Sequence, residues 1–163
     1  MSEKFEKVKD YVLELGFQID EEDPSEEIVI INDEERGIHK LVLDCEDTLL
    51  VLEQLIMKIG ASTDVYRRIL QMNRELVFGA FVLNEEGDSL LYRNTLALDN
   101  LDLNELESTI NALSLGLAEN GEELLGFVAK EYGRRSSWEA FSSVCSRPVR
   151  HRPTPWSTNS KIR

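Results

Sequence analysis

Few side chains in this sequence are of the types that catalyse reactions. The two histidines, His39 and His151, are far apart in the chain, and no serine or cysteine near either of them stands in a nucleophile motif. A histidine that acts as a general base needs a nucleophile or a substrate within hydrogen-bond reach. His39 falls within the run Ile38–Asp44, where it is most simply a solvent-facing strand residue. The alternative is a small enzyme whose site combines His39 with scattered carboxylates.

Metal-binding patterns are also missing from the sequence. Cys45 stands among acidic residues, but a zinc site requires several Cys or His residues at set spacings, and a calcium loop requires regularly spaced oxygen ligands around a glycine. The acidic run Asn84–Asp88 is too short for such a loop and is better explained as a turn. No glycine-rich phosphate loop and no HExxH motif occurs. We therefore expect no catalytic residue, no metal site and no cofactor, and we expect that the protein is not an enzyme.

Charge is distributed unevenly along the 163 residues. From Gly133 to the end there are seven Lys or Arg residues and one Glu, a net charge of +6, so the rest of the chain must carry −19 to give the total of −13. A surface this acidic repels nucleic acids and anionic membranes and favours basic or neutral partners. The basic C-terminal segment, with Trp138 and Trp156 available to stack on bases, leaves a nucleic-acid contact through that segment as an alternative.

Cysteine usage and hydropathy indicate a cytoplasmic protein. Cys45 and Cys145 form no CxxC pair, as is usual for reduced thiols in the cytosol. No apolar run approaches the roughly 20 residues of a membrane helix. The N-terminal residues Met1–Lys7 lack the apolar core of a signal peptide.

Hydrophobic spacing predicts three main helices, over residues 3–15, 63–73 and 103–120. Ser2 can cap the first helix, and Gly16 can end it in the left-handed conformation. Asp102 and Glu105 form the acidic variant of a capping box at the start of the third helix. We expect this helix to stop at Asn120–Gly121, with a further helical segment over residues 124–132.

Two hairpins and two less regular extended segments are predicted between the helices. The expected hairpin strands are Glu27–Asn32 with Ile38–Asp44, and Val77–Leu83 with Ser89–Leu96. Phe17–Asp20 begins a further extended segment. Thr48–Ile59 is ambiguous, because it fits a helical stripe and is also apolar on all sides.

The composition changes after Tyr132. Residues 133–163 hold three of the four prolines, seven serines and most of the excess positive charge. Such a segment cannot bury enough apolar area to offset the entropy of ordering it. We therefore expect a domain over residues 1–132 and a basic, disordered tail over 133–163. A changed reading frame or an added extension is an alternative origin of this composition.

The order of elements, with the sequences of Tyr66–Asn73, Phe78–Leu83 and Leu98–Leu106, resembles the type III secretion chaperone-like group, which includes the Tir-type chaperones and the YbjN-type proteins of bacteria. The resemblance covers residues 2–132. It implies an α+β fold in which helices pack an antiparallel sheet, in the order α-β-β-β-α-β-β-α. It also implies that Leu49–Met57 is the third strand of this order.

Members of this group commonly form homodimers, and the secretion chaperones hold an effector segment in extended form on apolar patches. The resemblance therefore implies a non-enzymatic protein-binding module, used in secretion or in regulation, that binds a protein partner as a homodimer. Exposed apolar side chains usually mark such contacts. We assign partner binding to Ile28, Ile30, Leu41 and Leu43, and the dimer interface to Val65, Ile69 and Met72. Replacement of Ile69 by Asp is then expected to give a monomer.

Overall fold

A computed structural model of the protein describes residues 2–128. Residues 1 and 129–163 lie outside this description, and with them the predicted tail and the histidine and cysteine it contains. The described elements, in chain order, are α1 (Glu3–Glu14), β1 (Gln18–Asp23), β2 (Ile28–Asp33), a 3-10 turn (Glu34–Arg36), β3 (Ile38–Glu46), β4 (Leu49–Lys58), α2 (Thr63–Met72), β5 (Ala80–Leu83), β6 (Ser89–Ala97), a second 3-10 turn (Leu98–Asn100) and α3 (Leu103–Leu125).

The strands form one antiparallel sheet of six strands in the order β1-β2-β3-β4-β6-β5. The α+β class and the antiparallel sheet predicted from the sequence are confirmed. The ambiguous run is strand β4, and the extended segment after Phe17 is completed as strand β1, so four strands rather than three come before α2. Strands β1 and β5 are the two edges of the sheet.

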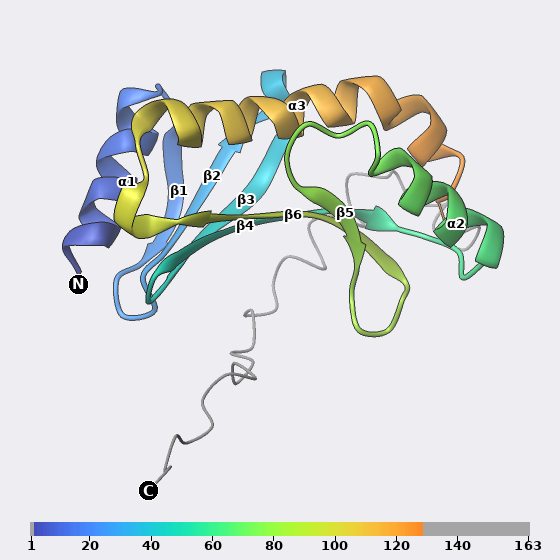
Figure 1. The fold of residues 1–163 in the computed structure, drawn as a ribbon, viewed down its shortest axis with the longest axis horizontal. Coiled ribbons are helices and arrows are strands. Elements are labelled where there is room, and N and C mark those ends of the chain that lie inside the picture. Colours follow the sequence, from blue (N-terminus) through green and yellow to red (C-terminus); the bar gives the residue numbers. More distant parts are fainter. Residues whose placement is uncertain (1, 129–163) are drawn as a thin grey trace, which may run out of the picture.

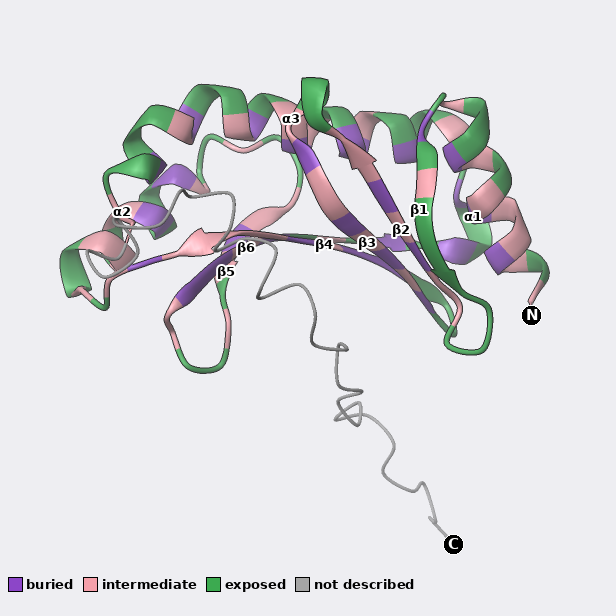
Figure 2. Ribbon diagram, turned by 180° about the vertical axis from the view of Figure 1, so that it is seen from behind, coloured by how far each residue is buried: buried purple, intermediate pink, exposed green. Residues whose placement is uncertain are grey.

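Helices α1 and α3 lie on one face of the sheet, and α2 lies at the end near β5 (Figure 1). The core is packed between this face and the two helices, where Figure 2 shows most of the buried positions. Phe5 and Val8 of α1 and Leu106 and Ile110 of α3 are among its buried side chains. None of the helices in the described part of the chain is long and apolar enough to span a membrane.

Local signals at the helix starts behave as the sequence predicts. The Ser2 side chain accepts a hydrogen bond from the amide of Phe5, and the Asp102 side chain accepts one from the amide of Glu105 at 2.7 Å. Gly16 has φ = 81°, the left-handed conformation that favours glycine. These contacts fix where α1 and α3 begin and where the chain turns after α1.

Helix α3 differs from the prediction at its C-terminal half. It runs without interruption through Asn120–Gly121 to Leu125, so the predicted stop is wrong. The reason is that the Asn120 side chain is buried and donates to the carbonyl of Gly116, one turn earlier, at 2.9 Å. An asparagine whose amide is bonded along the helix does not compete for the backbone in the way that ends a helix.

Candidate protein-binding face

The face of the sheet opposite α1 and α3 is covered by no helix of the described chain (Figure 1). Strand residues alternate between the two faces, so the side chains next to buried positions point to this open face. In β2, for example, Val29 and Ile31 are buried while Ile28 and Ile30 are half-buried. Seven apolar side chains on the open face are Ile28, Ile30, Val42, Val51, Leu55, Val82 and Leu91, and we call these seven residues the open-face set. Leu49, which is 42% exposed, pairs with Ala97 on the same face, where β4 begins and β6 ends.

Strand register brings part of this set together over β2, β3 and β4. Ile30 pairs with Val42, and Ile28 and Val51 both pair with Asp44. Directly opposed residues have Cβ atoms about 4.5–5.5 Å apart, so these side chains touch across the strands. Val51 is buried by its neighbours, while the other three keep partial exposure. The result is a group of four apolar side chains around the carboxylate of Asp44, which stands between Ile28 and Val51.

A second group of the open-face set lies over β4, β6 and β5. Leu55 pairs with Leu91, and Leu91 pairs with Val82. Between the two groups stands a cross-strand ion pair, in which Arg93 donates to Glu53 at 2.6 Å. The open face therefore presents two apolar groups separated by one neutralised charge pair.

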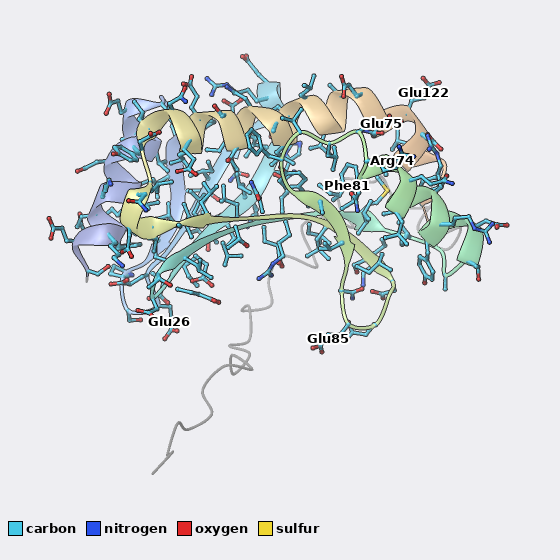
Figure 3. All side chains as sticks on the ribbon, viewed as in Figure 1. Glu26, Arg74, Glu75, Phe81, Glu85 and Glu122 are labelled. Carbon is cyan, nitrogen blue, oxygen red and sulfur yellow. The ribbon has the colours of Figure 1, made fainter. Side chains whose placement is uncertain are left out.

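Acidic residues border the open face. The β1–β2 turn and the β5–β6 turn both project on this side of the sheet, and Figure 3 shows Glu26 and Glu85 at their tips. At the β1 edge, Glu21 pairs with Lys40 at 3.4 Å. Because residues 2–128 carry a net charge of −19, with most of their Lys and Arg side chains already in ion pairs, the field around this face is negative.

The four residues assigned to partner binding from the sequence lie on both faces of the sheet. Ile28 and Ile30 belong to the open face. Leu41 and Leu43 are 0% exposed and face the helices, so they are not surface residues. Strand β3 carries apolar side chains on both faces, and its alternation alone does not show which set is covered. Val42, the residue between them, could have been found as the register partner of Ile30.

The residues assigned to the dimer interface also differ in exposure. Ile69 is 3% exposed and Met72 is 0% exposed, because this side of α2 packs on the core. Val65 is half-buried. The apolar side chain that α2 does present to solvent is Leu70, which is 69% exposed.

The free edge at β5 is closed by one side chain. Asn73, just after α2, donates from its amide nitrogen to the carbonyl of Phe81 at 3.0 Å and accepts from the amide of Phe81 at 2.8 Å. It thus imitates the two hydrogen bonds that a neighbouring strand would make. Unpaired edge groups invite pairing with other chains, and Asn73 removes the pair at the centre of β5.

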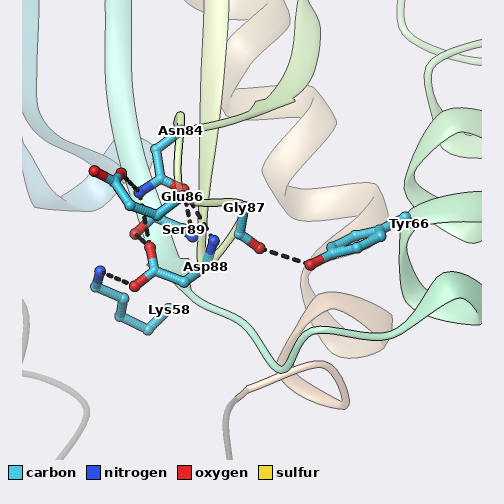
Figure 4. A network of polar contacts seen from close by, with 7 residues as sticks. All are labelled: Lys58, Tyr66, Asn84, Glu86, Gly87, Asp88 and Ser89. Atoms are coloured by element: carbon cyan, nitrogen blue, oxygen red, sulfur yellow. Dashed lines mark hydrogen bonds and ion pairs between the residues drawn. The ribbon is translucent and has the colours of Figure 1, made fainter.

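A network of polar contacts holds the β5–β6 turn (Figure 4). The Asn84 side chain accepts from the amides of Asp88 and Ser89, and Lys58 donates to Asp88 at 2.8 Å. Hydrogen bonds from Lys58, Ser89 and Asn84 lower the pKa of Asp88 to about 2. Among the described residues, no three His, Cys, Asp or Glu side chains come together as metal ligands.

His39 and Cys45 are residues of reactive types in the described chain, and the contacts described here are part of the fold. The amide of His39 donates to the side chain of Gln54, which also donates to the carbonyl of Gly37 and fills the space where β3 separates from β4. Cys45 is buried on the core face, and burial raises the pKa of its thiol to about 12. A thiol with that pKa stays protonated at neutral pH and is a poor nucleophile.

This arrangement of helices and strands also occurs in known proteins. Solved structures that share the fold include YbjN, a proposed transcription regulator from E. coli, with a TM-score of 0.56 and 10% identity over 74% of this chain and 92% of that chain. No curated protein matches the sequence. The CesT_Tir_1 family model, which describes type III secretion chaperones, matches residues 1–130. The chain therefore belongs to the CesT/Tir-type family of type III secretion chaperones.

Proposed function

We propose that this protein is a non-enzymatic, cytoplasmic module that binds a segment of a protein partner on its open face. The observation that carries this proposal is the open-face set itself, seven apolar side chains on a sheet face that no helix of residues 2–128 covers. Apolar patches of this kind on small proteins usually mark protein contacts. Membership of a chaperone family supports the same class of function.

The geometry of the face favours a partner segment that lies across the strands. The two apolar groups, centred on Val42 and Leu91, sit on either side of the Glu53–Arg93 ion pair. Each aliphatic side chain that is removed from water contributes on the order of 1 kcal/mol. Apolar side chains of the partner would fill both groups, and its polar atoms would meet the ion pair. The negative border favours a partner segment that is basic or neutral.

We further propose that the protein acts as a homodimer and in regulation rather than in secretion. The outer side of α2 exposes Leu70, an apolar side chain that lies away from the open face, and this exposure supports an interface there. YbjN, whose fold this chain shares, is described as a proposed transcription regulator, and this description supports the regulatory reading.

The test is a comparison of partners captured by two variants from the protein's own cells. Ile30→Asp places a charge in the open-face set, while Asn111→Asp places the same charge at an exposed site of α3, on the other side of the sheet. We expect the wild type and Asn111→Asp to retain one dominant protein at high salt, identified by mass spectrometry, and Ile30→Asp to lose it. Equal retention by a folded Ile30→Asp variant would exclude the open face as the binding site.

A further inference from the structure

The open face lacks a described occupant, and its chemistry restricts what can cover it. Its centre is aliphatic, and its border carries acidic turns (Figure 3). A segment that binds there needs apolar or aromatic side chains for the centre and cations for the border. Such a segment gains from burial and from charge at once, and the second gain weakens as salt screens it.

The C-terminal part of the same chain has this composition. Residues 129–163 lie outside the described structure and carry a net charge of +6. The family model ends at residue 130, so nearly all of this segment is additional to the family domain. Its basic and aromatic residues alternate in groups: Arg134, Arg135, Trp138, Phe141, Arg147, Arg150, Arg152 and Trp156. The stretch Lys4–Tyr11 also combines cations and aromatic residues, but it carries Glu6 and Asp10 as well and belongs to helix α1.

The described chain ends beside the sheet. Val128 forms an antiparallel bridge with Ile59, directly after β4, and the amide of Gly60 donates to the carbonyl of Phe127 at 3.2 Å. Strand β4 carries Val51 and Leu55 of the open-face set. At about 3.3 Å per extended residue, the 35 residues of 129–163 span roughly 115 Å, several times the length of any strand here. The segment can therefore reach all of the open face.

From these three observations we infer that the basic segment Arg134–Arg152 docks on the open face of its own chain and competes there with the protein partner. Docking joins this segment, whose net charge is +4, to the domain, whose net charge is −19, and covers the aliphatic side chains. The regulatory half of this inference rests on the proposed function, whereas the docking itself does not.

Tethering makes weak docking sufficient. A flexible tether holds a segment at an effective concentration of about 1 mM. If the docked segment binds with a dissociation constant of about 0.1 mM, it occupies the face about nine-tenths of the time and weakens partner binding about tenfold. Loss of the segment's charge would then strengthen partner binding by about that factor.

The test uses the full chain and its own cysteines. Cys145 lies in the segment, whereas Cys45 is buried with a protonated thiol, so a nitroxide reagent labels Cys145 alone. In NMR spectra of the ¹⁵N-labelled protein, we expect paramagnetic broadening of the β2, β3, β4 and β6 amides around the open-face set. The α1 and α3 amides, behind the sheet, should be broadened less. The Cys145→Ser variant, treated with the same reagent, is the control for labelling elsewhere.

The contribution of the segment's positive charge to docking is tested with the variant in which Arg147, Arg150 and Arg152 are all replaced by Glu. We expect it to lose the broadening, and we expect high salt to reduce the broadening in the wild type. No broadening, or broadening centred on α1 and α3, would overturn the inference. A mixture of ¹⁵N-labelled protein without nitroxide and unlabelled protein with nitroxide reports contacts between chains. Equal broadening in that mixture would show that a second copy supplies the segment and would also overturn it.

Competition between the basic segment and the protein partner is measured as the affinity for the partner that the wild type captures. We expect the triple Glu variant to bind that partner about tenfold more tightly than the wild type does. Unchanged affinity would overturn the competition. The NMR results are independent of the capture experiment, because they need no partner, and loss of the partner by Ile30→Asp tests the binding face whether or not the segment docks there. Failure of the docking and failure of the proposed function therefore give different outcomes.

Discussion

The side chain of Asn73 makes the two hydrogen bonds to Phe81 that a neighbouring strand would make. Its amide nitrogen and oxygen bond both backbone groups of Phe81, and the Phe81 side chain is buried against Tyr92 with the two rings edge to face. Removal of the Asn73 amide leaves a partly buried donor and acceptor without partners. Each such loss costs about 1 kcal/mol, because the backbone groups were desolvated on folding.

We therefore predict that Asn73→Ala lowers the free energy of unfolding by about 1–2 kcal/mol, measured by urea denaturation. The matched control is Asn111→Ala, at an exposed site of α3, where the change should be within about 0.5 kcal/mol of zero. If Asn73→Ala and Asn111→Ala unfold at the same urea concentration, the contacts with Phe81 contribute nothing to stability.

Asp88 gives a prediction about pH. Its pKa is lowered from 3.8 to about 2 by Lys58, Ser89 and Asn84, so the folded state favours the ionised carboxyl. A group with a lowered folded pKa adds stability above its unfolded pKa, and that stability is lost as the pH falls towards the folded value. We predict that wild type is more stable than Asp88→Asn near pH 6 and that the difference closes by about pH 2.

Urea midpoints of both proteins across this pH range measure that difference. All other carboxyl groups titrate in both proteins, so their contribution cancels in the comparison. A gap that stays constant down to about pH 2 would mean that Asp88 is not stabilised by these contacts in its charged form.

At the scale of elements, helix α3 shows where a sequence rule misleads. The pair Asn120–Gly121 is typical of a helix end, yet the helix continues because buried Asn120 bonds to Gly116 within it. Gly121 is then an interior helical glycine, and nothing lies within 4 Å of a Cβ placed there. We predict that Gly121→Ala raises the free energy of unfolding by about 0.5–1 kcal/mol, measured by urea denaturation.

Gly79 differs from Gly121 in its backbone conformation and in the space around it. It has φ = 69°, and a Cβ there would lie 2.4 Å from the Tyr92 ring. The same replacement at Gly79 should therefore destabilise the protein, and it separates the effect of local space from a general effect of alanine. A destabilised Gly121→Ala variant would mean that α3 does end, in solution, where the sequence rule puts it.

The sequence predicts which segments form helices and strands better than it predicts which face of a strand is covered. Helix starts at Ser2 and Asp102 depend on contacts within four residues, so local signals were enough to find them. The covered face of β3 depends on where α1 and α3 pack, which local spacing does not encode when Leu41, Val42 and Leu43 are all apolar. For this reason the sequence assigns Leu41 and Leu43 to partner binding, whereas both are buried on the face that packs against the helices. The register with β2 supplies the missing information, because Val42 opposes Ile30.

At the scale of the whole molecule, the fold is a sheet with one packed face and one open face. Both helices that could cover the sheet lie on the same side, and α2 lies at its end (Figure 1). The open face is therefore an apolar surface of the described chain, and Leu70 is an exposed apolar side chain on a different element, the outer side of α2. A substitution at Leu70 should leave the open face intact.

The outer side of α2 gives the last prediction. Ile69, assigned to the dimer interface from the sequence, is buried in the subunit, so Ile69→Asp would place an unpaired charge in the core and unfold the protein rather than separate two subunits. Leu70, next to it, is 69% exposed, and Leu70→Asp should leave the fold unchanged. We predict that light scattering gives a dimer for the wild type and a monomer for Leu70→Asp. Leu115→Asp, at an exposed site of α3, is the control that should remain a dimer. A dimeric, folded Leu70→Asp variant would move the interface away from α2, and a monomeric wild type would exclude the homodimer itself.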